Sequence, residues 1–250
     1  MKAYVLVNPN NNRLVDNKIP TYPSILPTYD IVFGPTSDTV GPVPDWYIEH
    51  HGCRDAIRKR GYCAYVGHMT AICNHYAKYP DEDLLVMEDD VVFEPNFNEY
   101  YRNFMKMVPQ NCDAIYFGGW YFDNTPTEIV PNVLKPDNKG YIFGAECILL
   151  NSRLIKLIVT YYNAPVVDDR VQFDSMLANW TKNNIIKTYT PITMFAHQSA
   201  GFSAVLNRTI DRDCNKNNIV NYYSIDGNIL TSSKEDLKRY KDHEGVCDNH

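Results

Sequence analysis

Residues 83–93 read Asp-Leu-Leu-Val-Met-Glu-Asp-Asp-Val-Val-Phe, an apolar run interrupted by three consecutive carboxylates. The apolar residues Leu84–Met87 predict a buried strand, and the whole stretch is interpreted as one strand that runs straight into its acidic residues. Side chains two positions apart on a strand point to the same face, so Glu88 and Asp90 are expected to face one cavity, with Asp89 on the other side. Burying three carboxylates is costly unless cations compensate them, which indicates a binding site.

Carboxylate oxygens are the ligands that Mg²⁺ and Mn²⁺ prefer, and such an ion can bridge protein carboxylates to a diphosphate and assist a nucleotide leaving group. Asp90 is the first predicted metal ligand. Glu88 is expected to contact the metal, its water shell or a ribose, and Asp89 to orient the neighbouring protein backbone at the cofactor site. The alternative is a solvated strand end whose carboxylates cap the next turn. The apolar runs on both sides favour the site.

Segments with strand-like and helix-like patterns alternate along the chain. The expected strands are 2–8, 29–33, 83–93, 113–118, 141–150 and 185–189, and the expected helices are 53–79 with an interruption near Gly61, 97–107, 152–162 and 174–182. This alternation favours an α/β fold with a mainly parallel, mixed sheet flanked by helices, which binds ligands at the carboxyl ends of its strands. Residues 1–210 are expected to form this single domain, and residues 211–250 a polar C-terminal extension packed on it.

Composition narrows the class of protein further. The chain has 250 residues, 44% of them hydrophobic, and a net charge of -6. It therefore lacks the excess of basic residues that is typical of nucleic-acid-binding proteins. No stretch approaches the roughly 20 apolar residues of a membrane span, and the first residues lack the pattern of a signal peptide, so we expect a soluble, cytoplasmic protein. The seven cysteines form no CxxC pair, which favours reduced thiols over disulfides or a zinc site.

Several segments also match a known set of motifs in the correct order. The acidic stretch followed by Phe97 has the pattern hydrophobic–EDD–hydrophobic … F. The other matching segments are Ala3–Asn8 followed by Arg13, Cys63–His68, Phe143–Leu150, Phe173–Leu177 and His197–Ser203. Together they resemble glycosyltransferase family 25, the lipopolysaccharide and collagen galactosyltransferase-like group, over roughly residues 2–205.

The resemblance implies a GT-A fold and a nucleotide-sugar donor. Our main interpretation is an inverting glycosyltransferase that uses a UDP-sugar, a divalent Mn²⁺ or Mg²⁺ ion and a glycan acceptor. The resemblance places Val7, Asn8 and Arg13 at the nucleotide base, His68 at the donor, and His197 as a further metal ligand. Four of them have an alternative interpretation: core packing for Val7 and for His68, a surface charge for Arg13, and a hydrogen-bonded, partly buried ring for His197.

The chain departs from the family pattern in two places. Tyr62 and Gly67 stand where the family has glycine and serine, and no leucine follows Asn8. Such departures are typical of a distant member, of the kind encoded by bacteria or by large DNA viruses, and a viral enzyme would act in the host cytoplasm. They leave the identity of the sugar open.

An inverting transfer needs a carboxylate that accepts the proton of the attacking hydroxyl. Asp168, Asp169 and Asp174 lie near the start of the predicted helix 174–182, where the helix dipole stabilises a carboxylate. Asp174 matches the family's aspartate and is the first choice, with Asp169 also retained; the alternative is that Asp174 only caps the helix. Glu146, beside Gly144 in a predicted strand, is a second kind of candidate.

Other functions remain open at this point. A retaining GT-A transferase or a nucleotidyltransferase also uses carboxylates at a strand end with a divalent metal. The loop Asn-Pro-Asn-Asn-Asn after the first strand lacks the glycines and the cations of a nucleotidyltransferase loop, which counts against that class. A non-catalytic carbohydrate-binding domain is the alternative from a different class.

Overall fold

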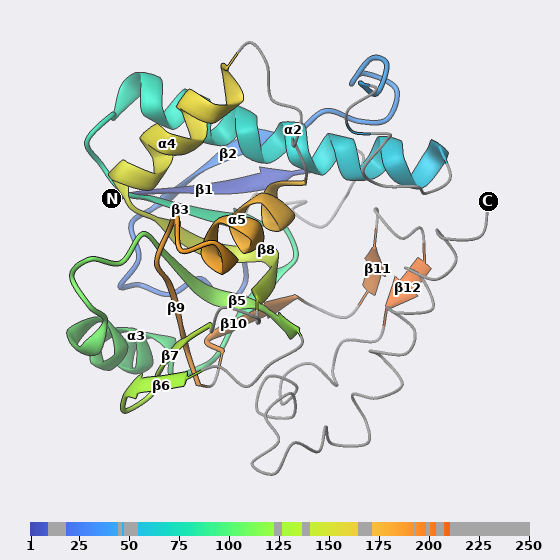
Figure 1. Cartoon of the computed structure of the whole chain (residues 1–250). Helices are drawn as coiled ribbons and strands as arrows, with labels where there is room; N and C mark the ends of the chain where they lie inside the picture. Colours follow the sequence, from blue (N-terminus) through green and yellow to red (C-terminus); the bar gives the residue numbers. More distant parts are fainter. Residues whose placement is uncertain are drawn as a thin grey trace.

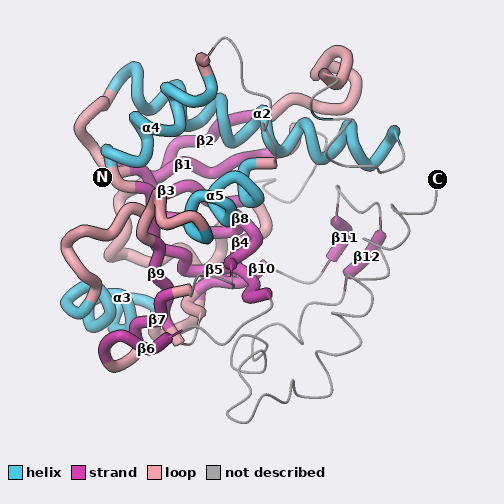
Figure 2. Tube along the Cα trace, in the orientation of Figure 1, coloured by secondary structure: helices cyan, strands magenta, loops and turns pink. Residues whose placement is uncertain are grey.

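The computed structural model describes residues 1–9, 19–44, 47, 55–122, 127–136, 141–164, 172–192, 194–198, 201–203 and 208–210 (Figure 1, Figure 2). Three of the predicted site residues, Arg13, Asp168 and Asp169, lie outside these ranges. The predicted extension 211–250 lies outside them as well. Among the helices in the described ranges, none is both long and apolar enough to cross a membrane.

A mixed eight-stranded sheet forms the centre of the molecule (Figure 1). Its strand order is β2 (Tyr29–Phe33), β1 (Lys2–Val7), β3 (Leu84–Glu88), β8 (Tyr141–Leu150), β5 (Ala114–Phe122), β9 (Thr188–Pro191), β7 (Val133–Lys135) and β6 (Thr127–Val130). Strands β8 and β7 are antiparallel to their neighbours, so the other strands of the sheet share one direction. The predicted α/β fold with a mainly parallel, mixed sheet is therefore confirmed.

Helices cover both faces of this sheet (Figure 2). One apolar core lies between the sheet and the helices α2 (Asp55–Lys78), α4 (Ser152–Tyr162) and α5 (Phe173–Lys182). The second core lies on the opposite face, where α3 (Phe97–Met107) packs with the short strands β4 (Val91–Phe93) and β10 (Ala196–Gln198). The strands Gly201–Ser203 (β11) and Arg208–Ile210 (β12) pair only with each other among the described residues.

The central strands are apolar because both of their faces are buried. Ala3–Val7 of β1 are all buried, and Leu84–Met87 of β3 are completely inaccessible to solvent. Strands covered on both faces show such continuous apolar runs instead of an alternating pattern. Their parallel register pairs Leu6 with Glu88, so the ends of β1 and β3 lie side by side.

The acidic stretch differs from its prediction as one strand. Asp89 and Asp90 form a turn between β3 and β4, and β4 leaves the central sheet to pair antiparallel with β10. The chain turns here because consecutive carboxylates cannot continue between two apolar layers without a large desolvation cost. The argument that Glu88 and Asp90 share one face of a continuous strand is therefore wrong.

The predicted interruption of the first helix is also wrong, since α2 runs without a break from Asp55 to Lys78. Gly61 lies inside this helix for a packing reason. A Cβ at Gly61 would lie 2.6 Å from the hydroxyl oxygen of Tyr47, which is fully buried against the helix. The glycine thus allows a close approach and does not end the helix.

Candidate functional site

The acidic turn lies at the carboxyl end of a central strand. Glu88 is the last residue of β3, which lies between β1 and β8 in the sheet, and Asp89 and Asp90 follow directly. All three side chains are partly exposed, while Oδ1 of Asp90 is shielded from solvent. Ligands of open α/β sheets usually bind at the carboxyl ends of the strands, so these carboxylates lie where a ligand is expected.

His197 lies on the strand next to this turn but is directed at another carboxylate. The β4–β10 ladder pairs His197 with Val92, and Nδ1 of His197 is 3.6 Å from Oε1 of Glu94. Both side chains are mostly buried, at 19% and 17% exposure. Its role as a metal ligand stays a prediction, and Glu94 is a neighbour that the sequence did not single out.

The described residues contain no group of three or more His, Cys, Asp or Glu side chains arranged to hold a metal ion. This argues against an all-protein metal cage in that part of the chain. Mg²⁺ is usually bound through one or two carboxylates together with substrate phosphates. Glu88 and Asp90 are two partly exposed carboxylates at a strand end, which is the number of protein ligands that this second mode uses.

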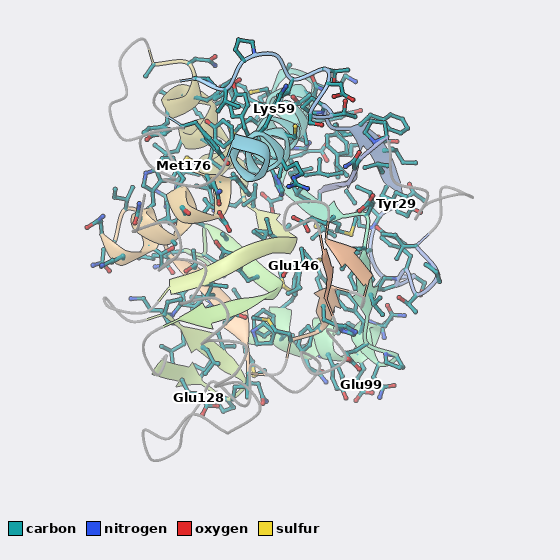
Figure 3. The ribbon with its side chains drawn as sticks, turned by 90° about the vertical axis from the view of Figure 1, so that its right-hand side faces the viewer. Tyr29, Lys59, Glu99, Glu128, Glu146 and Met176 are labelled. Atoms are coloured by element: carbon teal, nitrogen blue, oxygen red, sulfur yellow. The ribbon has the colours of Figure 1, made fainter. Side chains whose placement is uncertain are left out.

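Glu146 brings a further carboxylate to the same edge of the sheet. Met87 of β3 pairs with Cys147 of antiparallel β8 at the end of that ladder, so Glu88 and Glu146 are the next residues beyond this pair on their two strands. Although it is charged, Glu146 is only 3% exposed, and it lies near the middle of the molecule in Figure 3. A buried carboxylate at the ligand-binding edge of a sheet is a candidate for chemistry.

Gly144 makes room for this carboxylate. Its φ of +91° lies in a region that side-chain-bearing residues rarely adopt. A Cβ at this position would lie 2.9 Å from both Cδ and Oε1 of Glu146, and closer still to Oε2. The β5–β8 ladder shifts register between Gly118 and Trp120, opposite this part of β8, so Gly144 and Glu146 lie in a bulge. Bulges commonly re-aim side chains next to active sites.

Asp174 approaches the same bulge from α5. The Ser175 N–H donates to Oδ1 of Asp174 over 2.8 Å. Burial raises the pKa of Asp174, and the backbone N–H groups of Ser175, Gly144 and Asp174 itself oppose that rise. Gly144 therefore contacts both Glu146 and Asp174, and the predicted base lies beside the bulge. Asp174 also satisfies a first-turn N–H, as the capping alternative expected.

His68 is buried where α2 meets α5. It is 4% exposed, its ring stacks on Phe173 with centroids 4.7 Å apart, and its Nδ1 lies 2.9 Å from the carbonyl oxygen of Ala64. Burial lowers the pKa of His68 to about 4, against smaller opposing effects of the Ala64 and Ala145 backbones. The ring is therefore neutral at pH 7, and it packs directly against the residue that precedes Asp174.

The two predicted residues at the end of β1 differ in their surroundings. The side chain of Val7 is 6% exposed and belongs to the core beneath the sheet, while its carbonyl accepts the Gly34 N–H at 2.9 Å. Asn8 is partly exposed just beyond the strand. Asn8 is thus the better placed of the two for contact with a ligand, and Val7 matches the core-packing interpretation.

Comparison with known proteins gives short or distant similarities. No protein-family model matches the chain. A stretch of 59 residues is 41% identical to a procollagen lysyl hydroxylase and glycosyltransferase of Acanthamoeba polyphaga mimivirus. This stretch is 23% of the chain, and the match spans 6% of the length of the viral protein.

Two solved structures are similar over larger parts of the chain. The match to a protein named A197 from STIV spans 76% of this chain and 81% of the STIV chain, with 13% sequence identity and a TM-score of 0.36. The match to apo UDP-glucose pyrophosphorylase spans 76% of this chain and 90% of the pyrophosphorylase chain, with 11% sequence identity and a TM-score of 0.36. These TM-scores are too low to assign either protein's fold or activity to the chain.

Proposed function

We propose that the chain is a glycosyltransferase of the GT-A type, related to family 25, which moves a sugar from a UDP-sugar to a glycan hydroxyl with Mn²⁺ or Mg²⁺. The observation that carries the proposal is the acidic turn Glu88–Asp90 at the carboxyl end of β3. The name of the mimivirus relative, a glycosyltransferase, supports the same class. That support is limited to the short matched stretch.

In this proposal Asp90 and Glu88 hold the metal together with the diphosphate of the donor. The metal, when bound, neutralises the charge that develops on the nucleotide leaving group. Asn8, at the neighbouring end of β1, contacts the nucleotide. The side-by-side ends of β1 and β3, where Leu6 pairs with Glu88, support this division of roles.

Asp174 is the proposed base of an inverting transfer. Burial raises its pKa toward the working pH, which is the direction that makes a carboxylate a stronger base. Glu146 is the alternative base, because it is buried in the same bulge and contacts Gly144 as well. Either carboxylate would accept the proton from the acceptor hydroxyl as that hydroxyl attacks the donor sugar.

Thermal unfolding with a panel of UDP-, GDP- and CMP-sugars, each with and without Mn²⁺, tests the proposal. A ligand that binds only the native state stabilises it by about 2.7 kcal/mol at a hundredfold excess over its Kd. We expect a UDP-sugar to raise the melting temperature of the native chain only when Mn²⁺ is present. The anomer of the transfer product, read by NMR, then separates inverting from retaining transfer.

The matched pair of variants is Asp90→Asn and Asp81→Asn. Asp81 is an exposed carboxylate in the turn that precedes β3, at the opposite end of the same strand. Asp90→Asn is expected to abolish the Mn²⁺-dependent shift, while Asp81→Asn keeps it. The proposal fails if no donor shifts the native chain, or if Asp90→Asn responds to donor and Mn²⁺ as the native chain does.

A further inference from the structure

A cavity of about 340 Å³ lies between α3 and the loop segments around β7 and β9, apart from the acidic turn. Small-ligand pockets usually measure roughly 300–1,000 Å³, so it has room for a small ligand. The lining includes Glu99, Tyr100 and Asn103 on one side of α3. Asn132, Ile192 and Phe195 line it from the loop segments. Figure 3 shows Glu99 and Glu128 at the end of the molecule opposite Lys59.

A stacked aromatic pair forms the apolar wall of the cavity. The rings of Tyr100 and Phe195 are nearly parallel, at 26°, with centroids 5.4 Å apart. Phe195 is 6% exposed and packs nearly perpendicular to the ring of Phe104, with centroids 5.6 Å apart, whereas Tyr100 is 40% exposed. A large aromatic ring is thus fixed at the surface by its packing, and it offers a flat, amphipathic contact area.

The described residues at the rim of the cavity are polar, and none of them carries a positive charge. Glu99, Asn103 and Asn132 are exposed. In the described part of the chain, their side chains form no hydrogen bond with another residue. Among the described residues that line the cavity there is no Lys, Arg or His. An anionic ligand such as a phosphate therefore finds no counter-charge among these residues, while a polyhydroxylated neutral ligand finds both donors and acceptors there.

Asn132 is held in place by its backbone. It has a φ of +67°, its N–H donates to Oε1 of Glu128 over 2.9 Å, and its carbonyl accepts the Ile192 N–H over 3.3 Å. Asparagine is one of the few side-chain-bearing residues that adopt this conformation readily. Because both backbone groups are engaged, the side-chain amide is the part of Asn132 that remains to contact a ligand.

We propose that this cavity binds a neutral pyranose unit, which stacks on Tyr100 and is hydrogen-bonded by Asn103 and Asn132. A pyranose combines a face of C–H groups with a rim of hydroxyls, and the cavity combines an aromatic wall with amides and one carboxylate. This saccharide site does not depend on the proposed transfer reaction, because its lining residues include none of the acidic turn.

The cavity is nevertheless connected to that turn through β4 and β10. The carbonyl of Phe195 accepts the Glu94 N–H over 2.9 Å, and Glu94 directly follows β4, which begins at Val91 beside Asp90. Three residues of extended strand span about 10 Å. A glycan chain of a few units is long enough to cover such a distance.

Saturation-transfer NMR with the methyl glycosides of glucose, galactose, mannose, xylose and N-acetylglucosamine, at millimolar concentration, tests the proposal. We expect saturable binding of at least one glycoside to the native chain. Tyr100→Ala is expected to weaken it at least tenfold, whereas Tyr100→Phe keeps the ring and most of the affinity. Asn132→Gly removes the amide but tolerates the positive φ, and it is expected to weaken binding about fivefold.

Arg102→Ala is the matched control, because Arg102 is an exposed residue of α3 that does not line the cavity. It is expected to bind as the native chain does, and so is Asp90→Asn, which separates this site from the proposed donor site. Absence of binding by every glycoside overturns the proposal. Binding that Tyr100→Ala leaves unchanged, in a variant with native thermal stability, overturns it equally.

Discussion

Replacing Gly144 by alanine is expected to destabilise the chain by roughly 2–5 kcal/mol, through backbone strain and a collision with Glu146. The φ of +91° costs a side-chain-bearing residue about 1–2 kcal/mol. The new Cβ would lie 2.9 Å from Cδ and Oε1 of Glu146, which is 3% exposed and cannot move into solvent without disturbing the core. Overpacking of this kind usually costs about 1–3 kcal/mol.

A double-mutant cycle with Glu146→Ala separates the two contributions. In the Glu146→Ala background the collision is gone, so Gly144→Ala should cost only the backbone part of about 1–2 kcal/mol. Urea unfolding followed by circular dichroism measures the free energy of unfolding of all four proteins. If the two substitutions add within about 0.5 kcal/mol, Glu146 does not lie against Gly144 and the reasoning is refuted.

Asp174→Asn should stabilise the chain at pH 7, because the raised pKa means that the folded state binds a proton more tightly than the unfolded state. This gain in the free energy of unfolding should vanish as the pH falls below about 3.9, the pKa of an aspartate in an unfolded chain. Urea unfolding at a series of pH values measures the gain, and a gain that does not change with pH would contradict the prediction. Asp113→Ala should lower the free energy of unfolding by about 3 kcal/mol in the same assay. The buried Asp113 carboxylate accepts hydrogen bonds from the Lys187 backbone N–H, over 2.8 Å, and from Nε of Arg153. Gly118→Ala should cost about 1–3 kcal/mol, because its Cβ would lie 2.8 Å from the carbonyl oxygen of Ala196 in β10. Normal stability of Gly118→Ala would show that β10 does not pack on β5 at this point.

Much of the fold could be predicted from local pattern alone. The apolar run Leu84–Met87 is a buried strand, as predicted, because a strand covered on both faces consists of consecutive apolar residues. The helices predicted at 97–107 and 152–162 have the observed bounds, since their apolar residues recur at helical spacing and no proline interrupts them. The same pattern predicted that Glu88 directly follows buried strand residues, although it did not predict that the strand ends there.

Prediction failed where distant segments decide the local conformation. The turn at Asp89 and Asp90 depends on β10, which pairs with β4 from about a hundred residues further along the chain. The interruption expected at Gly61 did not occur, because the glycine admits the side chain of Tyr47. The hairpin β6–β7 was not predicted, since its strands are only four and three residues long.

The sequence by itself determined an α/β chain with a carboxylate cluster at the end of a buried strand. Periodicity and burial are local properties, so a few neighbouring residues suffice to show them. Only the tertiary structure decided that Glu146 and Glu88 lie just beyond the same residue pair of β8 and β3, that Gly144 admits the Glu146 carboxylate, and that Asp174 reaches the same bulge. These contacts join β3, β8 and α5, and their register depends on packing summed over the whole sheet, which no single segment of the sequence contains.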